Sequence, residues 1–306
     1  MNIITKKDTI SNENAVYYFK KEYDVKEQGK SVIKIFAETR YKLYINGKLA
    51  GVGPCKSSSD VKYYDELDIS GYIKKGKNTF EVTVLQLAND LYSDKYIFLQ
   101  SVVRSGDMCL TICGNAGDAE ITTDESWFVA KENGLVFFCE HEYKAYNATA
   151  LYEKISLMYR KLQFENAVSV SSLYDMDDQS TNSMELVNPV QKRVIPMMFF
   201  EDKNFIASRN GVFDAGKLTC GYIRLKCNGR GCIKLTYAEC MAVKLREDGT
   251  IIKGRRDDEN GIIIGDYDII EIEGECILEQ IIVCAQSLTL DTIFLLKGTN
   301  QNEEIY

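Results

Sequence analysis

RYKLYINGKLAGVGPCKSSSDVKYYDELDI, residues 40–69, is the stretch that decides the class of fold. Its Asn46-Gly47 pair separates two short strand-like runs. Both residues of such a pair tolerate positive φ, which a type I′ turn requires, and this turn has the twist of two antiparallel strands. We therefore predict a hairpin over 41–50, followed by a strand that alternates polar and apolar residues over 65–69.

Short strand-like runs recur on both sides of this hairpin, separated by Gly, Asn and Asp turns. In the first half they cover 17–25, 31–37, 79–87, 96–103, 108–113 and 126–130. In the second half they cover 221–227, 232–239, 262–272, 276–285 and 287–296. Such spacing is typical of antiparallel sandwiches, because βαβ units need long helical periods between strands. Only 145–162 has convincing helical content. We predict an all-β protein of two antiparallel, jelly-roll-like β-sandwich domains with few helices.

The stretch SSLYDMDDQSTNSMELVNPVQK, residues 171–192, interrupts this pattern. Polar residues dominate it and the apolar alternation fades, as in exposed connections between domains. The length of 306 residues also agrees with about two domains. We predict a first sandwich over 1–170, a linker over 171–192 and a second sandwich over 193–306.

Charge and composition exclude several classes of partner. The net charge of −8 argues against nucleic acid and anionic membranes, since both select Lys and Arg patches. No run of eighteen apolar residues occurs, and the N-terminus lacks an apolar core of signal-peptide length. We expect a soluble, cytoplasmic chain. The ten cysteines form no CxxC pair, and those in strand-like runs are typical of reduced core thiols. These are Cys109, Cys227, Cys232, Cys276 and Cys284.

No catalytic signature stands out. His141 is the only histidine and no GxSxG surrounds a serine, which argues against a nucleophile and base of the hydrolase type. The run 257–259, Asp-Asp-Glu, lies in GRRDDENG, which is typical of a solvated loop. Trp127, the only tryptophan, is more typical of a core residue than of a sugar platform. We predict neither catalytic residues nor a metal cluster, although two carboxylates facing across a cleft would suffice for glycoside hydrolysis.

Two segments carry a resemblance to a known family. Residues 41–85 contain a Y-x-N-G-K-x-x-G hairpin, a strand with Tyr-Asp and a K-x-G-x-N turn, in this order. They resemble the N-terminal sandwich of bacterial α-L-rhamnosidases. Residues 213–239 contain D-x-G-x-x-x-x-G-Y-x-R-L and a strand that ends in Tyr-Ala-Glu. They are similar to the second sandwich of the same enzymes. Two matches in the family's order are more specific than either alone.

The resemblance implies a non-catalytic role. In that family a helical (α/α)6 barrel follows the two sandwiches and carries catalysis, and this sequence ends where the barrel would begin. We therefore expect a carbohydrate-binding or scaffolding portion of a glycoside hydrolase, with a helical catalytic domain on further sequence or on another chain. Two alternatives remain open: a self-sufficient glycosidase with a carboxylate pair between the sandwiches, and a pure protein-interaction module.

The resemblance also implies a carbohydrate site. Some of these sandwiches bind rhamnose, some with calcium, through Asp and Asn side chains near the loop that follows the strand 79–87. This carries the prediction to Asn89, Asp90 and Tyr92, with Tyr64 and Asp65 beside them. Rhamnose-containing sugars are the candidate ligands, and calcium is the one candidate cofactor. The family commonly has Gly-Trp-Tyr in this loop, whereas Leu91 stands where the tryptophan would fall.

Overall fold

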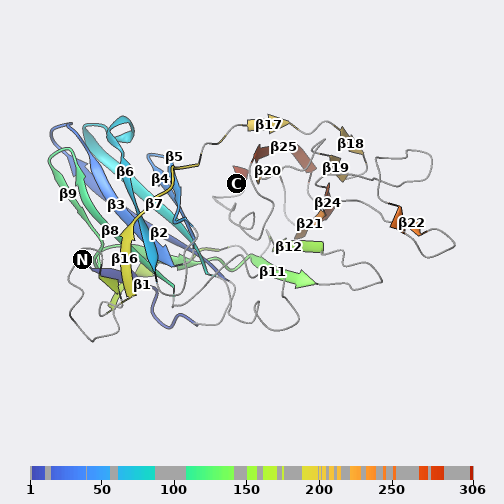
Figure 1. Cartoon of the computed structure of the whole chain (residues 1–306), viewed down its shortest axis with the longest axis horizontal. Coiled ribbons are helices and arrows are strands. Elements are labelled where there is room, and N and C mark those ends of the chain that lie inside the picture. Colours follow the sequence, from blue (N-terminus) through green and yellow to red (C-terminus); the bar gives the residue numbers. More distant parts are fainter. Residues whose placement is uncertain are drawn as a thin grey trace. The chain divides into compact units, whose positions relative to one another are not determined.

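Figure 1 shows a computed structural model of the chain. The backbone is described for 2–10, 15–38, 40–55, 61–86, 108–140, 150–156, 161–170, 174–175, 188–198, 200, 202–204, 207–209, 212–214, 221–228, 232–238, 244–245, 251–252, 269–274, 277–285 and 304–305. Side chains are described for 2–10, 15–38, 40–55, 61–86, 108–134, 161–170, 190–198 and 200.

Strands make up nearly all regular structure in these residues. The only helical element in the described ranges is the 3₁₀ turn η1 (Ser70–Tyr72). The prediction of an all-β chain is therefore confirmed. No helix in the described part of the chain is long and apolar enough to cross a membrane.

The chain forms two compact units that do not follow one another in sequence. The first contains 1–132 and 162–198, and the second contains 133–161 and 199–306. The sequence predicted one boundary between domains, at 171–192, whereas the chain passes from one unit to the other three times. The last part of that stretch, β16 (Asn188–Lys192), is a strand of the first unit, paired in parallel with β6 (Lys62–Asp68). Polar composition cannot reveal such a pairing with a strand more than a hundred residues away.

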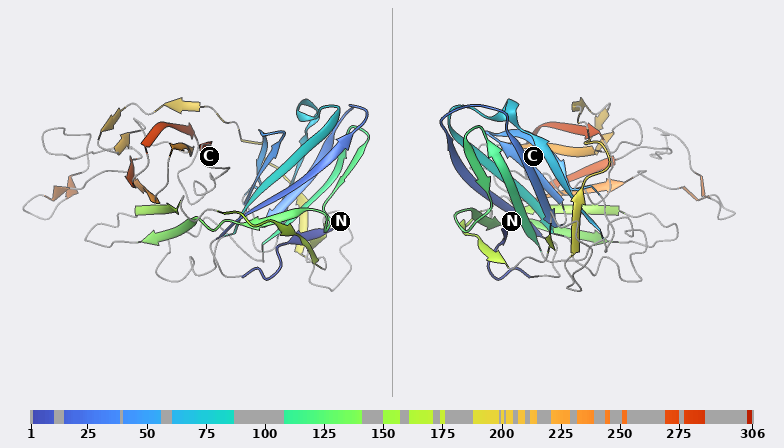
Figure 2. Two further views of the ribbon diagram at one scale, coloured as in Figure 1. Left: turned by 180° about the vertical axis from the view of Figure 1, so that it is seen from behind. Right: turned by 60° about the vertical axis from the view of Figure 1, so that its left-hand side comes forward.

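The first unit is a sandwich of two sheets (Figure 2). Sheet 1 has the strand order β14 (Val168–Val170), β1 (Ile3–Thr5), β8 (Cys109–Ala116), β3 (Val32–Glu38), β6, β16 and β15 (Tyr174–Asp175), with β9 (Ala119–Thr122) beside β8. Sheet 2 has the order β13 (Glu165–Asn166), β10 (Phe128–Lys131), β2 (Ala15–Val25), β7 (Gly76–Gln86), β4 (Arg40–Ile45) and β5 (Lys48–Gly53). The strands predicted over 17–25, 31–37, 79–87, 108–113 and 126–130 are confirmed, and 96–103 lies outside the described residues.

The core of this unit lies between the two sheets. Alternate residues of each strand meet in one buried cluster, which includes Tyr17 of β2, Ile35 of β3 and Val82 of β7. Trp127 is 0% exposed and belongs to the same cluster, so its assignment to the core is confirmed. Each large apolar side chain buried in this way contributes roughly 1.5 to 3 kcal/mol. Cys109 is a reduced, buried thiol, as predicted.

The predicted Asn-Gly hairpin is confirmed as β4 and β5. Asn46 has φ of 52° and Gly47 has φ of 77°, as a type I′ turn requires. The Asn46 amide nitrogen donates to the Asn78 side-chain oxygen at 2.9 Å, and Asn46 Oδ1 accepts from the Thr79 backbone N–H at 3.1 Å. These bonds join the hairpin turn to the K-x-G-x-N turn before β7. The two motifs are therefore parts of one structural corner.

The second unit is also built from sheets. Sheet 3 has the order β11 (Leu135–Glu140), β12 (Ala150–Ser156), β21 (Cys232–Ala238), β24 (Ile269–Gly274), β19 (Val212–Asp214) and β18 (Ala207–Arg209). Sheet 4 has the order β17 (Asp202–Asn204), β25 (Ile277–Ala285), β20 (Gly221–Asn228) and β26 (Glu304–Ile305), and β22 (Lys244–Leu245) pairs with β23 (Ile251–Ile252).

The sequence predictions for the second unit have mixed outcomes. Strands over 221–227, 232–239 and 276–285 are confirmed, and β24 covers the end of 262–272 and two residues beyond it. The run 287–296 lies outside the described residues. The expected helical content of 145–162 is wrong over 150–156, because those residues form the strand β12. Pairing on both sides, with β11 and β21, overrides the local helical preference.

Candidate functional site

The three loop residues predicted to bind sugar, Asn89, Asp90 and Tyr92, lie outside the described residues. The structure describes the chain up to Gln86, where β7 ends. The Gln86 side chain is buried, and its amide nitrogen donates to the Ile10 carbonyl oxygen at 2.7 Å. The predicted loop therefore starts from an anchored strand end.

Asp65, the predicted carboxylate beside that loop, lies inside the first sandwich. It sits on β6 opposite Ile35 of β3, on the face of sheet 1 that lines the core, and is 0% exposed. The Tyr41 hydroxyl, on β4 of the facing sheet, donates to its Oδ2. Arg193 Nη1 donates to its Oδ1 at 2.9 Å, and the Arg193 side chain is only 6% exposed. A carboxylate, a phenol and a guanidinium thus form a closed buried cluster.

The electrostatics of this cluster follow from its burial. Burial raises the pKa of the Asp65 carboxyl, while the hydrogen bonds from Tyr41 and Arg193 oppose that rise. Burial also raises the pKa of the Tyr41 hydroxyl well above its ordinary value, and the neighbouring Asp65 charge adds to the effect. Burial likewise raises the pKa of the nearby Cys55 thiol. Tyr41 therefore remains a neutral donor, and Cys55 is not an activated thiolate.

Local sequence makes room for the buried carboxylate. A Cβ atom at position 53 would lie 1.8 Å from Asp65 Oδ2, so β5 needs glycine where it passes the cluster. The Arg193 backbone N–H donates to the Tyr64 carbonyl oxygen at 2.9 Å, which places the guanidinium beside β6. No local sequence pattern indicates this ion pair, because Arg193 is 128 residues away from its partner.

Tyr64 and Asp65 do not share a surface. Neighbouring residues of a strand project to opposite faces of the sheet, so Tyr64 lies on the outer face of sheet 1. There it is 8% exposed and packs in a small cluster with Ile3, Phe36 and Val190, among others. Tyr64 therefore packs in an apolar cluster, while Asp65 is held by Tyr41 and Arg193. A sugar hydroxyl would have to displace Tyr41 or Arg193 to reach the Asp65 carboxylate.

The other buried carboxylates of the described residues also have structural partners. Glu38 Oε1 lies 3.0 Å from Lys62 Nζ, and both side chains are 3% exposed. Glu132 accepts a hydrogen bond of 3.0 Å from the Tyr18 hydroxyl. A lysine ammonium therefore contacts Glu38, and a tyrosine hydroxyl contacts Glu132.

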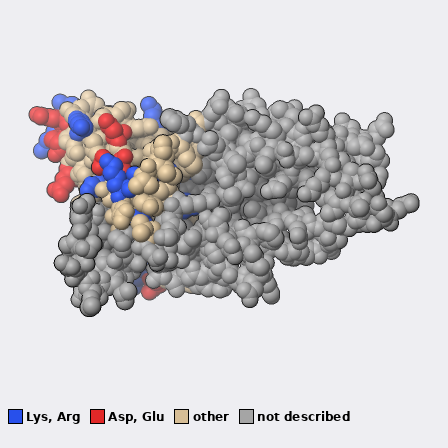
Figure 3. Space-filling model, in the orientation of Figure 1, with Lys and Arg blue, Asp and Glu red and all other residues tan. Residues whose placement is uncertain are grey.

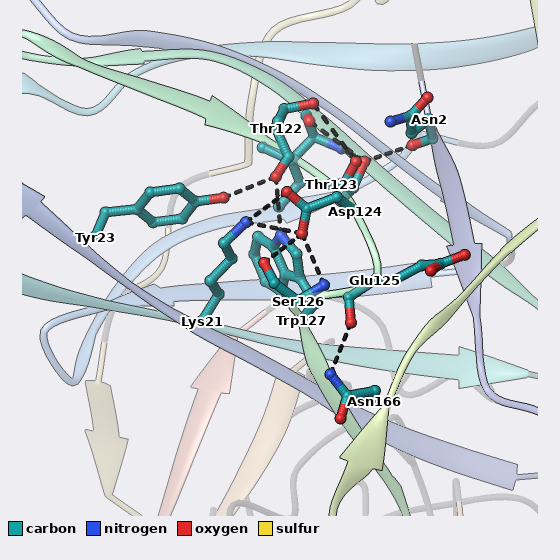
Figure 4. A network of polar contacts seen from close by, with 11 residues as sticks. Asn2, Lys21, Tyr23, Thr122, Thr123, Asp124, Glu125, Ser126, Trp127 and Asn166 are labelled. Atoms are coloured by element: carbon teal, nitrogen blue, oxygen red, sulfur yellow. Dashed lines mark hydrogen bonds and ion pairs between the residues drawn. The ribbon is translucent and has the colours of Figure 1, made fainter.

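A second polar network fixes the loop before β10 (Figure 4). The Thr122 carbonyl oxygen accepts from the Tyr23 hydroxyl at 2.7 Å and from Trp127 Nε1 at 3.0 Å. Lys21 Nζ donates to both Asp124 carboxylate oxygens at 2.9 Å. Burial raises the pKa of the Tyr23 hydroxyl, which therefore stays protonated. The network satisfies the polar ends of the Tyr23 and Trp127 rings and pairs the Asp124 carboxylate with Lys21.

Two exposed rings lie on the outer face of sheet 2. Phe128 of β10 is 44% exposed, and Phe164, just before β13, is 37% exposed. Lys20 of β2 is the cross-strand neighbour of Phe128, and its Nζ lies 3.6 Å from the centroid of the Phe164 ring. In the described part of the first unit these are the most exposed aromatic side chains. The sequence analysis assigned Trp127 to the core, and strand alternation places its neighbour Phe128 on the opposite, exposed face.

Charges on the described surface are mixed. On the face seen in Figure 3, Lys and Arg side chains are interspersed with Asp and Glu. No group of three or more His, Cys, Asp or Glu suited to a metal occurs among the described residues. His141 and residues 257–259 lie outside them, as does the loop around Asn89 and Asp90 beside which calcium is a candidate cofactor.

Comparison with known proteins places this fold. No protein-family model matches the sequence, and no curated protein matches it. Three similar solved structures are two rhamnosidases and a lectin. An α-L-rhamnosidase from Aspergillus terreus has a TM-score of 0.50 and 15% identity, over 94% of this chain and 36% of that one. A family GH78 rhamnosidase from Bacillus sp. GL1 has a TM-score of 0.49 and 18% identity, over 94% and 33%. A Pleurotus ostreatus lectin, in complex with GalNAc, has a TM-score of 0.37 and 13% identity, over 93% and 75%.

The chain spans about a third of the length of these rhamnosidases, 36% and 33% respectively. Identity of this order indicates a shared fold and nothing finer. The resemblance that the sequence motifs predicted is confirmed at that level: this chain is similar in fold to part of an α-L-rhamnosidase.

Proposed function

We propose that this chain is a non-catalytic, carbohydrate-binding or scaffolding part of an α-L-rhamnosidase-like glycoside hydrolase. The observation that carries this proposal is the fold similarity to the Aspergillus terreus enzyme, which extends over 94% of the chain. Two motif segments in the family's order, 41–85 and 213–239, support it independently. The catalytic partner would be a helical domain on further sequence or on another chain.

We place the sugar site on the loop after β7, at Asn89, Asp90 and Tyr92. Gln86 supports this position, because its buried side chain holds the end of β7 in place. Short Asn and Asp side chains can exchange hydrogen bonds with vicinal hydroxyls, or hold a calcium ion that does so. Leu91 offers no aromatic surface to the apolar face of the sugar. We therefore expect millimolar dissociation, a binding free energy of about 4 kcal/mol.

A titration of the full chain tests the binding half of the proposal. L-Rhamnose is added with and without calcium, and amide shifts are followed by NMR. We expect saturable shifts that Asn89→Ala or Asp90→Ala removes. Asp24→Ala, which changes an exposed carboxylate on β2, is the matched control and should leave them unchanged.

The titration has two outcomes against the proposed site. Shifts that survive both loop variants and map to Phe128 and Phe164 would move the site to the outer face of sheet 2. An absence of shifts at high concentrations of rhamnose and other sugars would remove carbohydrate binding and leave only the scaffolding role.

A further inference from the structure

We propose that residues 133–161 complete the second unit, although they lie within the sequence of the first sandwich. They provide a hairpin without which the second unit does not fold. In sequence the segment lies between β10 and β13. Those two strands pair with each other in sheet 2 of the first unit. Its own strands, β11 and β12, pair instead with β21 in sheet 3 of the second unit (Figure 1). This inference concerns how the two units fold and goes beyond the proposed function.

The two ends of the segment are held together by one side chain. Asn133 Nδ2 donates to the Lys161 carbonyl oxygen at 3.0 Å, and Asn133 Oδ1 accepts from the Lys161 backbone N–H at 3.1 Å. The asparagine amide thus satisfies both backbone groups of the residue where the segment ends. The excursion is a closed loop, so β10 and β13 can pair as if it were absent.

The register of sheet 3 shows that the hairpin fits it. The pairings place Leu151, Glu153 and Ile155 of β12 opposite Tyr237, Leu235 and Ile233 of β21, respectively. The same face continues through Ile272 and Ile270 of β24 and through Leu135, Phe137 and Cys139 of β11. One face is therefore apolar across four strands, except at Glu153. On the opposite face the central positions are polar in β12, β21 and β24, with Lys154, Lys234, Thr236, Glu271 and Glu273, whereas β11 carries the apolar Val136 and Phe138 there.

This match of pattern and register indicates a native partner. Side chains alternate along a strand, so a slip of one residue would put Lys154 on the apolar face and Ile155 on the polar one. Without the hairpin, β21 would be the edge of sheet 3. The backbone groups of β21 that face β12 would lack partners, and the apolar residues of β21 would lose their neighbours on that side. The second unit therefore depends on a segment that lies more than seventy residues before β21.

Two adjacent substitutions in the full chain test whether β12 stabilises the whole of sheet 3 or only its own hairpin. Ile155→Asp puts a charge on the apolar face, whereas Lys154→Asp changes the opposite face and relieves the like-charge register with Lys234. Hydrogen exchange followed by mass spectrometry reads the amides of each strand separately. We expect Ile155→Asp to speed exchange in β21 and β24 by roughly a hundredfold and to leave β2 and β7 unchanged. Lys154→Asp should leave all four strands as protected as before.

Ile155→Ala keeps the test valid if the charged variant fails to fold. It shortens the side chain without adding a charge, and we expect roughly tenfold faster exchange confined to sheet 3. Unchanged protection of β21 in both Ile155 variants would overturn the proposal. Equal loss of protection in β2 and β7 would also overturn it, since the hairpin would then support the first unit.

Discussion

Replacing Arg193 with methionine should destabilise the first unit by about 3 to 5 kcal/mol, because it leaves a buried carboxylate without its cation. Asp65 is 0% exposed and the Arg193 side chain 6% exposed, so water cannot replace the lost partner. Methionine keeps much of the length and apolar contact of the arginine stem. The cost therefore arises from the uncompensated charge and not from a cavity.

Trp127 provides the assay. It is the only tryptophan in the sequence and lies fully buried in the core of the first unit, so its emission reports unfolding of that unit alone. The midpoint of urea unfolding is compared between the natural chain and the variant. The control is Lys192→Met, which removes a pair of 2.7 Å with Glu66 whose side chains are 58% and 36% exposed. Such exposed pairs contribute less than about 1 kcal/mol.

The effect should depend on pH in a defined direction. A carboxyl whose native pKa is raised stabilises the fold below its unfolded pKa, and that stability is lost as pH rises through the native pKa. Burial already raises the pKa of Asp65, and the loss of Arg193 removes an opposing effect. The stability gap between the natural chain and Arg193→Met should thus be full at neutral pH and shrink toward pH 3.8, the ordinary value of the group.

Two results would refute this reasoning. One is a midpoint shift for Arg193→Met no larger than that for Lys192→Met. The other is a gap that stays constant from neutral pH to pH 4. The double variant Asp65→Asn with Arg193→Met removes both charges and should recover a large share of the lost stability.

Three further predictions concern the same unit and its chemistry. Gly53→Ala should cost at least about 2 kcal/mol, because its Cβ would lie 1.8 Å from the Asp65 carboxylate, whereas Gly71→Ala, with nothing within 4 Å, should be tolerated; Trp127 emission in urea measures both. Asn78→Ala should cost about 2 kcal/mol by the same assay, since its buried amide bonds to the backbone on both sides of its turn; an unchanged midpoint would contradict this. The purified chain should release no product from an aryl α-L-rhamnoside; turnover abolished by one carboxylate substitution would show instead a self-sufficient glycosidase.

The local sequence was sufficient to predict the elements that are held mainly by contacts between residues close in sequence. The Asn46-Gly47 pair predicts its hairpin because the positive φ of both residues is a property of the residues themselves. The strand β7 is predictable because Phe80, Val82 and Val84, which lie in the core, alternate with polar residues. The segment 150–156 was misread as helical because its conformation is set by β21, from residue 232 onward.

Only the tertiary structure revealed the surroundings of Tyr64 and Asp65. Residue patterns were enough to predict an all-β fold, its turns and a resemblance to rhamnosidase sandwiches. The alternation over 65–69 placed Asp65 on the face of Leu67 and Ile69, but it could not show that the Tyr41 hydroxyl meets this carboxylate from the facing sheet. Nor could it show the partner, Arg193, or the transfer of 133–161 to the second unit. Each depends on pairing between distant strands, whose register is fixed by the total burial of both sheets and not by any single segment.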